Sequence, residues 1–528
     1  MNKIFLNLSF GMLLFFVVTI GHTQSVINVL VYGAKNDGVY KNTLAIKAAI
    51  EKASSQGGGT VYFPAGNYLT GPIHLKRDIT LYIDSGATII FSEDFDDYLP
   101  MVPTRFQGAN GKGFSPLIYG NNLQNVSIVG MGTIDGQGEV WQKAIKEIRK
   151  AEKEGIINEP NKWQKIFAKN NPEKKNLDQS GFQRPLFIQF LNSSRIKIKD
   201  IKVINAPFWT VHFVDCDNVT VDGVYIKNPE ESSNTDGINP ESSRNVKITN
   251  CVIDVGDDCI SIKSGKGSEA RENYKPSKNI QISNCTMIHG AAGVSIGSEM
   301  SAGVENVVIS NCIIENTGKG IHIKTNRNRG GYIKNVRVNN IIIKDILYCF
   351  DEVPAAMHIN AMYYDKDSIQ NMPITKSTPI LENIHFSNIT MSNIKYPVFL
   401  YGLGESNFKD ISFSNMDISS IEGMKIKNVD GLSMKNISMR TVSSDILNAS
   451  YIKNMNIEGF MVKDNNSRTI DLEEASNIEI VYNSKSPKNY KIHGATTKNI
   501  NLKGHHIEAG VNVEVVKEVP KTEVHINQ

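Results

Sequence analysis

Cysteine, net charge and long apolar runs are all scarce in this sequence of 528 residues. Six cysteines are too few for a fold held together by disulfide bonds. The 57 Lys and Arg balance 54 Asp and Glu, and the net charge of +3 gives no electrostatic basis for binding nucleic acid or an anionic membrane surface. After the N-terminal segment, no apolar run approaches the roughly 18 residues of a membrane-spanning helix. We therefore expect a monomer with no nucleic-acid partner and no membrane insertion.

The N-terminus has the layout of a secretory signal peptide. Lys3 is the only charged residue before an 11-residue apolar run at positions 10–20, which small and polar residues follow. A run of this length is too short to span a bilayer, whereas it suits a cleavable export signal. We predict that residues 1–23 are a signal peptide, cleaved near Thr23 or Gln24. The mature protein is then exported to the periplasm or the extracellular medium.

A repeated strand phrase is the main feature that the sequence does contain. It is seen as Asn245-Val-Lys-Ile-Thr-Asn-Cys251, and similar copies begin at Asn279 and Asn306. These copies start 34 and then 27 residues apart, and apolar residues alternate with mostly polar ones in each, as in a strand with one buried face. A strand that recurs at this interval, with no helix-length segment between copies, predicts a right-handed parallel β-helix. In this all-β fold, successive coils stack about 4.8 Å apart.

Two columns of side chains should follow from this stacking. Asparagine and then cysteine end each copy of the phrase: Asn250 and Cys251, Asn284 and Cys285, Asn311 and Cys312. We expect the asparagines to form a hydrogen-bonded ladder at the turns. The cysteines could be metal ligands or disulfides, but their spacing follows the repeat and not a ligand motif, so we predict a column of small core residues.

Other segments flank and interrupt the repeat. Apolar residues at helical spacing after Asn42 or Thr43 predict a helix that ends near the glycines at 57–59 and covers the open first coil. Residues 139–183 are rich in Lys, Glu, Asn and Gln and predict a helical insertion. We interpret residues 24–510 as one β-helix domain, followed at 511–528 by a terminal strand or a tail.

Two acidic turns flank the strand that begins at Asn245. The tetrapeptide Asn-Thr-Asp236-Gly precedes it, and Gly-Asp257-Asp258 follows it. Asp236 and Asp257 are 21 residues apart, a little under one coil, so they should lie on neighbouring coils. Either motif alone is also an ordinary turn former. Together, three carboxylates suit hydrolysis of a glycosidic bond, because inverting enzymes hold two carboxyl groups about 6.5–9.5 Å apart and crowding raises the pKa of one of them.

The pair of acidic turns resembles the signature of glycoside hydrolase family 28, the pectin-degrading polygalacturonases and their relatives. Other stretches are similar to family motifs: Asp135-Gly-Gln-Gly138, Gly293-Val-Ser-Ile-Gly297, Gly320-Ile-His-Ile-Lys324 and Arg329-Gly-Gly-Tyr332. The resemblance extends from about residue 27 to about residue 460 of the printed sequence. It implies a secreted catalytic domain that cleaves a galacturonate-containing backbone, polygalacturonan or rhamnogalacturonan, with inversion and without a metal or cofactor.

The same resemblance implies roles for individual residues. Asp257 is the expected general acid, and Asp236 and Asp258 are expected to position and deprotonate the attacking water. Lys324 is expected to meet a substrate carboxylate, because a flexible ammonium group suits a uronate in a partly wet groove. The remaining residues that we expect to contact substrate are Asn234, His322, His289 and Tyr363.

Two positions depart from the family pattern. Ala291 stands where the family has a histidine that can be absent from relatives that cleave mixed rhamnose–galacturonate backbones. His289, two residues earlier, either replaces that histidine or is a turn residue. His322 stands in place of the arginine of an Arg-Ile-Lys motif. A guanidinium group that can donate two parallel hydrogen bonds is thus replaced by an imidazole that is partly charged near neutral pH. We expect weaker or pH-dependent uronate recognition there. Tyr363 is either a stacking surface for a sugar ring or a core residue.

Two alternative functions fit a β-helix. A polysaccharide lyase needs calcium and a basic residue that abstracts a proton, and no Asp cluster here is backed by such a basic pair. A glycan-binding β-helix with an inactive site is disfavoured by the complete set of aspartates and favoured by the changes at Ala291 and His322. We further hypothesise that the insertion with Trp141 and Trp163 closes one end of the groove, so that cleavage starts at chain ends.

Overall fold

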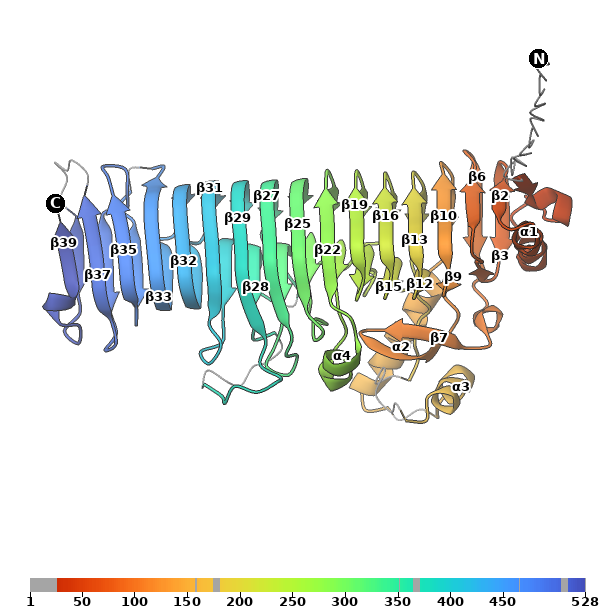
Figure 1. The fold of residues 1–528 in the computed structure, drawn as a ribbon, viewed down its shortest axis with the longest axis horizontal. Helices are drawn as coiled ribbons and strands as arrows, with labels where there is room; N and C mark the ends of the chain where they lie inside the picture. Colours follow the sequence, from red (N-terminus) through yellow and green to blue (C-terminus); the bar gives the residue numbers. More distant parts are fainter. Residues whose placement is uncertain are drawn as a thin grey trace, which may run out of the picture.

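The chain winds into one right-handed parallel β-helix, as expected from the repeat (Figure 1). The computed structural model describes residues 26–156, 159–173, 181–350, 352–363, 371–464, 466–504 and 511–527. The predicted signal peptide, residues 1–23, lies outside the described residues. Among the helices that the structure describes, none combines the length and apolar character of a membrane-crossing segment.

Each coil contributes strands to three faces, and every strand pairs in parallel with its counterparts on the neighbouring coils. The first face contains β1 (Val26–Asn28), β2 (Gly59–Phe63), β5 (Ile79–Ile83), β10 (Gln124–Gly130), β13 (Ser194–Lys199), β16 (Asp217–Asp222), β19 (Arg244–Thr249), β22 (Ser277–Ser283), β35 (Ser476–Tyr482), β37 (Lys498–Gly504) and β39 (Val524–Asn527). The second face contains β3 (Gly66–Thr70), β6 (Ala87–Phe91), β11 (Thr133–Asp135), β14 (Lys202–Ile204), β17 (Tyr225–Lys227), β20 (Val252–Asp254) and β23 (Thr286–Ile288).

The third face carries the acidic turns. It contains β4 (Ile73–His74), β9 (Ile118–Asn121), β12 (Ile188–Leu191), β15 (Val211–Val214), β18 (Ile238–Glu241), β21 (Ile260–Ile262), β24 (Val294–Ile296), β26 (Lys319–Lys324), β28 (Ala355–Asn360), β30 (Tyr396–Tyr401), β34 (Thr469–Glu473), β36 (Asn489–His493) and β38 (Asn512–Val515). Longer strands bend through more than one face: β25 (Val304–Glu315), β27 (Tyr332–Ile346), β29 (Ile380–Ile394), β31 (Phe408–Ser420), β32 (Met424–Thr441) and β33 (Asp445–Val462). The apolar residues of all three faces point inward and fill one continuous core.

The asparagine ladder is present as predicted. The side-chain amide of Asn284 donates to Asn250 over 3.3 Å, Asn311 donates to Asn284 over 3.4 Å, and Asn340 donates to Asn311 over 2.8 Å. Each of these asparagines has a backbone φ of 56° or 57°, the left-handed conformation that asparagine tolerates better than most residues. The ladder therefore turns the chain and also links the coils.

The cysteine column is also present. All six cysteines are free thiols, and those of the repeat are buried. The thiol of Cys251 donates to the carbonyl of Thr249 over 3.2 Å, and that of Cys285 donates to Ser283 over 3.3 Å. The prediction of core residues without disulfides is therefore confirmed.

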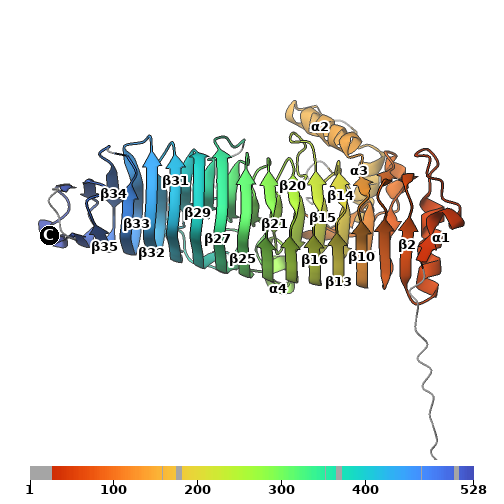
Figure 2. The same cartoon turned by 90° about the horizontal axis from the view of Figure 1, so that it is seen from above.

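The N-terminal end of the stack is covered by α1 (Thr43–Ser55), as predicted (Figure 2). Its buried face includes Ile46, Ala49 and Ile50. Asn42 occupies the position before the helix, but its side chain does not cap it. Instead its amide oxygen accepts a hydrogen bond of 2.7 Å from the backbone of Lys35. At the C-terminal end, β38 and β39 add strands to the stack.

Several elements lie beside the stack, on the side seen below it in Figure 1. They are the hairpin of β7 (Val102–Phe106) and β8 (Ala109–Gly113) and the helices α2 (Glu139–Lys153), α3 (Lys162–Asn170) and α4 (Gly267–Asn273). Short 3-10 helices occur at η1 (Val29–Tyr32), η2 (Phe95–Tyr98) and η3 (Lys521–Glu523).

The two helices of the predicted insertion support this hairpin. Trp141 of α2 is fully buried and stacks on Phe95 with ring centroids 3.9 Å apart. Phe167 of α3 packs with Met101 beside β7, and the side chain of Asn171 accepts a hydrogen bond of 2.9 Å from the backbone of Lys112 in β8. Trp141 therefore anchors the insertion against the segment around Phe95, and α3 holds the hairpin, which is the part that projects over the third face.

Candidate active site

The backbone places Asp236 and Asp258 at equivalent positions on adjacent coils. Gly237 donates its N–H to the carbonyl of Asp258 over 3.0 Å, and Ile238 donates to Cys259 over 3.0 Å. Each aspartate thus lies two residues before the first paired residue of its strand, β18 or β21. Parallel neighbours are about 4.8 Å apart, and Asp257 adjoins Asp258 in the chain, so three carboxylates gather at one point of the third face.

A network of polar contacts holds these carboxylates. Lys324 places its Nζ 2.9 Å from Oδ2 of Asp258, and the hydroxyl of Ser261 donates to the same oxygen over 3.1 Å. Asn239 donates to Oδ2 of Asp236 over 3.2 Å. The backbone N–H of Asp258 donates to Oδ1 of Asp257 over 2.9 Å.

Lys263 also belongs to this network, although it is absent from the sequence-based set. Its Nζ lies 3.6 Å from Oδ2 of Asp236 and 3.2 Å from Oε2 of Glu299. The ammonium group also lies 4.6 Å from the ring centroid of Trp209. A lysine at the end of an apolar strand directly after the acidic turn was the signal that could have identified it.

The surroundings of the three aspartates shift their pKa values in different directions. Burial raises the pKa of Asp257, and the charge of Asp258 raises it further. Burial likewise raises the pKa of Asp236 well above its ordinary value, together with the charge of Asp257. Burial also acts on Asp258, but the ammonium groups of Lys324 and Lys263 outweigh it and lower the pKa of Asp258. The site therefore keeps one carboxylate ionised beside groups that retain a proton to higher pH.

His322 is buried, and its surroundings disfavour the partial charge that the sequence led us to expect. Burial lowers the pKa of His322 well below its ordinary value, and the ammonium groups of Lys319 and Lys324 lower it further. Burial, and after it the two neighbouring ammonium groups, therefore favour the neutral form of the imidazole. Tyr363 lies next to it, with ring centroids 6.0 Å apart, and 5.4 Å from the Nζ of Lys324. Tyr363, His322 and Lys324 thus form one wall beside the aspartates.

His322 also belongs to a group of two histidines and a glutamate that has the composition of a metal centre. The ligand atoms of His322, Glu352 and His358 lie within 4.8 Å of one another. However, Nζ of Lys319 lies 3.3 Å from Oε2 of Glu352, the oxygen that also lies 3.3 Å from Nε2 of His322. A buried ammonium group at this carboxylate supplies the positive charge that a metal would bring, and it repels a second cation. The absence of a metal cofactor remains our prediction.

His289 and Asn234 contact residues outside the aspartate cluster. Nδ1 of His289 lies 2.9 Å from Oδ1 of Asp254, and its φ of 58° is that of a turn residue. The side-chain oxygen of Asn234 accepts a hydrogen bond of 2.7 Å from Arg184. Both residues lie on turns that border the site, and their direct contact with substrate remains a prediction.

The β7–β8 hairpin covers the third face on the N-terminal side of the aspartates. Arg105 of β7 lies 2.8 Å from Asp215 and 3.7 Å from Glu241, and its side chain is 4% exposed. The tip of the hairpin reaches further along the stack, because a Cβ added at Gly108 would lie 2.9 Å from the side chain of Glu299 and 3.2 Å from the backbone of Lys266. The backbone carbonyl of Arg105 accepts a hydrogen bond of 2.9 Å from the side chain of Gln189 in β12. The outer surface of β12, β15 and β18 is therefore occupied by protein.

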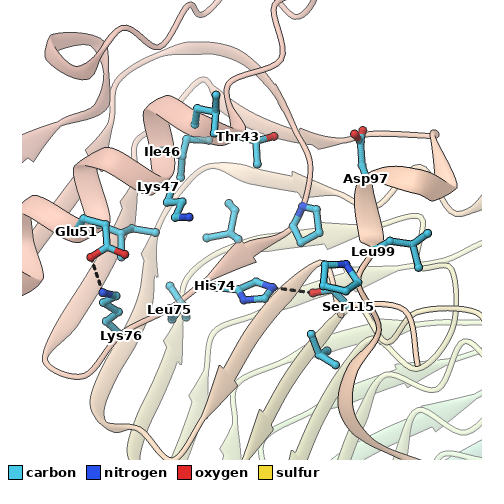
Figure 3. A pocket seen from close by; sticks show the side chains of 16 residues that line it. Thr43, Ile46, Lys47, Glu51, His74, Leu75, Lys76, Asp97, Leu99 and Ser115 are labelled. Atoms are coloured by element: carbon cyan, nitrogen blue, oxygen red, sulfur yellow. Dashed lines mark hydrogen bonds and ion pairs between the residues drawn. The ribbon is translucent and has the colours of Figure 1, made fainter. Parts of the chain in front are cut away.

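A separate pocket of about 510 Å³ lies beneath α1 (Figure 3). His74 and Ser115 share a hydrogen bond of 2.8 Å there, and Glu51 pairs with Lys76. None of the aspartates lines this pocket. It is therefore distinct from the candidate active site.

The β-helix fold and its cluster of three carboxylates suit an enzyme that cleaves a polysaccharide chain. Residues 60–367 match glycosyl hydrolases family 28, and the chain belongs to this family. It is 30% identical to a probable polygalacturonase of Vitis vinifera over an alignment of 406 residues. This alignment covers 75% of this chain and 74% of the relative. It is 31% identical to an endo-polygalacturonase of Pectobacterium carotovorum subsp. carotovorum over an alignment of 372 residues. This alignment covers 69% of this chain and 81% of the relative.

A solved structure agrees with this assignment. The hyperthermoactive exopolygalacturonase of Thermotoga maritima superposes with a TM-score of 0.65 at 31% identity and covers 79% of this chain and 92% of that chain. The protein is therefore a glycosidase of the pectin-degrading polygalacturonase family, and its substrate class is pectic polysaccharide.

Proposed function

We propose that the protein is an exported hydrolase that cleaves the galacturonate-containing backbone of pectin, polygalacturonan or rhamnogalacturonan, with inversion. The observation that carries this proposal is the meeting of three aspartates with different pKa shifts on two adjacent coils. The layout of residues 1–23 supports export.

Asp257 is the proposed general acid. It is only partly buried, so a glycosidic oxygen can reach it, and its raised pKa keeps the proton available in mildly acidic solution. As the bond between the anomeric carbon and this oxygen breaks, the proton of Asp257 passes to the leaving oxygen. A water molecule attacks the anomeric carbon from the opposite side, which inverts its configuration.

Asp236 and Asp258 are the proposed partners of that water. Asp236 accepts the proton of the water in the form of the enzyme in which Asp236 is ionised and Asp257 is still protonated; its raised pKa makes that ionised form a stronger base but requires a higher pH to populate it. Asp258 stays ionised because of Lys324, and it orients the water and balances positive charge at the anomeric carbon. We also expect Lys324 to share its ammonium group with a uronate carboxylate, since it lies 5.4 Å from the ring centroid of Tyr363 and beside Asp258 at the cleavage site.

The β7–β8 hairpin supports attack at chain ends. Its Arg105 contacts Gln189 and Asp215 on the coils N-terminal to the aspartates, where an internal segment of polymer would have to continue. One relative is named an endo-polygalacturonase and one solved structure an exopolygalacturonase, both at 31% identity, so their names do not decide the question. The expected early products are short oligosaccharides released from one end.

A panel of defined pectic oligosaccharides tests the proposal. Purified mature protein is incubated with galacturonate oligomers and with rhamnogalacturonan oligomers, and the products are followed by NMR. The expected result is a first-formed reducing end with the anomeric configuration opposite to that of the cleaved bond. Retention of configuration would refute the water-attack scheme, and an unsaturated sugar product would identify a lyase instead.

A further inference from the structure

The third face continues past the active site towards the C-terminal coils. Lys324 pairs in register with Asn360, Asn360 with Tyr401, and Tyr401 with Lys427. Residues in such a column point in the same direction, so all four side chains face outward with Lys324. Three steps of about 4.8 Å place Lys427 about 14 Å from Lys324 along the stack.

A polar hollow of about 880 Å³ begins at Lys427 and extends across the turn to the first face, where Lys453 pairs in register with Ser476 and Ser476 with Lys498. We call it the distal hollow, and its charged and aromatic lining consists of Lys427, Tyr451, Lys453, Glu474 and Lys498. Its amide-bearing lining residues are Asn371, Asn407, Asn428 and Asn477. The lining therefore combines three lysines with one acidic residue and several neutral donors.

The acidic residue of the distal hollow is already engaged. The carboxylate of Glu474 accepts hydrogen bonds from the backbone N–H groups of Ala495 over 3.1 Å and Thr496 over 2.8 Å. It also accepts one from the hydroxyl of Thr496. Glu474 therefore neutralises none of the three lysines directly.

The lysines of the distal hollow remain available for an anionic ligand. None of Lys427, Lys453 and Lys498 forms an ion pair with another residue that the structure describes. Nζ of Lys427 lies 5.1 Å from the ring centroid of Tyr451, whose side chain is 46% exposed. Cationic groups around an exposed aromatic face suit a ligand that has both carboxylates and apolar sugar faces.

We propose that the distal hollow binds the uronate chain downstream of the cleaved bond, as a remote substrate-binding site. This inference rests on the proposed function. The hairpin residue Arg105 contacts Gln189 and Asp215 on the coils N-terminal to the aspartates, so we expect a long substrate to leave the active site along the C-terminal coils. The distal hollow lies on that path, and its lysines face a polymer with regularly spaced carboxylates.

The test compares short and long substrates. The double variant Lys427→Ala/Lys453→Ala is assayed on digalacturonate, which occupies only the cleavage site, and on long polygalacturonate. The expected KM for the long polymer at low salt rises about threefold to tenfold, as for loss of two partly exposed charge contacts. The kcat and KM for digalacturonate stay unchanged. Because screening weakens exposed charge contacts, the difference should shrink at high salt.

A matched control and a binding assay separate the possible failures. Lys247→Ala removes an exposed lysine on β19, away from the distal hollow, and should leave both substrates unaffected. Calorimetric binding of polygalacturonate is also compared in Asp257→Asn proteins with and without the two lysine changes. If the wild-type protein cleaves neither substrate, the proposed function is refuted. The binding comparison still decides whether the distal hollow binds the polymer. Equal polymer affinity with and without Lys427 and Lys453 would overturn the remote binding site.

Discussion

Substituting Lys324 by Met removes the cation that holds Asp258 ionised. The two charges are 2.9 Å apart, and their side chains are 9% and 2% exposed. At an effective dielectric constant of about 20 they attract by about 6 kcal/mol, before desolvation is subtracted. Removing one partner of a buried pair costs about 3–5 kcal/mol. Because Ser261 still donates to Asp258, we expect the lower end, about 3 kcal/mol of unfolding free energy at pH 7.

The pH dependence of this loss is the diagnostic part of the prediction. The folded protein lowers the pKa of Asp258, so the stabilisation is full above the unfolded pKa and is lost as the pH falls through the folded pKa. The stability gap between wild type and Lys324→Met should therefore be largest at neutral pH and narrow in acid. In the variant, Asp258 needs a higher pH to ionise, so the acidic limb of kcat should move to higher pH.

Urea unfolding at several pH values and the pH profile of kcat measure these two effects. Lys334→Met is the control, because Lys334 is 34% exposed and lies 3.4 Å from Glu305 at the surface. That change should cost only about 0–1 kcal/mol. A Lys324→Met protein with unchanged stability at pH 7 and an unshifted acidic limb would refute our account of how the site is charged.

Three further predictions concern the hairpin, the metal question and the ladder. Arg105→Ala should loosen the β7–β8 hairpin and yield longer early products from polygalacturonate, detected by chromatography, and an unchanged product pattern would contradict chain-end attack. Activity should survive dialysis against EDTA, because Lys319 occupies the cationic position at Glu352, and a loss that added zinc reverses would show that we misjudged that cluster. Asn284→Ala should lower the free energy of unfolding by about 1–2 kcal/mol, because alanine is strained at a φ of 56° and breaks the ladder, and an unchanged midpoint of thermal unfolding would contradict that role.

The sequence predicted the solenoid because its information is local and repeated. The phrase that begins at Asn245, Asn279 and Asn306 specifies the inward face of each strand, and its asparagines specify the turns. Stacking then brings Asp236 and Asp258 into register without any long-range inference. The period of the repeat was therefore nearly sufficient to predict the register of these coils.

The remaining parts of the site depend on contacts between distant segments. Lys263 belongs to the aspartate network because the outer surface of β21 faces Glu299. The β7–β8 hairpin covers part of the groove. Its sequence does not belong to the repeat, so the repeat could not predict where the hairpin projects. The lowered pKa of His322 could not be read from a motif, because it arises first from burial of the imidazole and then from the charges of Lys319 and Lys324.

The most direct test of the central claim is the activity of Asp257→Asn on polygalacturonate. Asparagine has nearly the same shape and can still accept the N–H of Asp258, so the protein should fold with an unchanged thermal midpoint. It cannot donate a proton as a carboxylic acid does, and we expect kcat to fall by about 10²–10⁴-fold. Cleavage at the wild-type rate would contradict the assignment of Asp257 as the general acid.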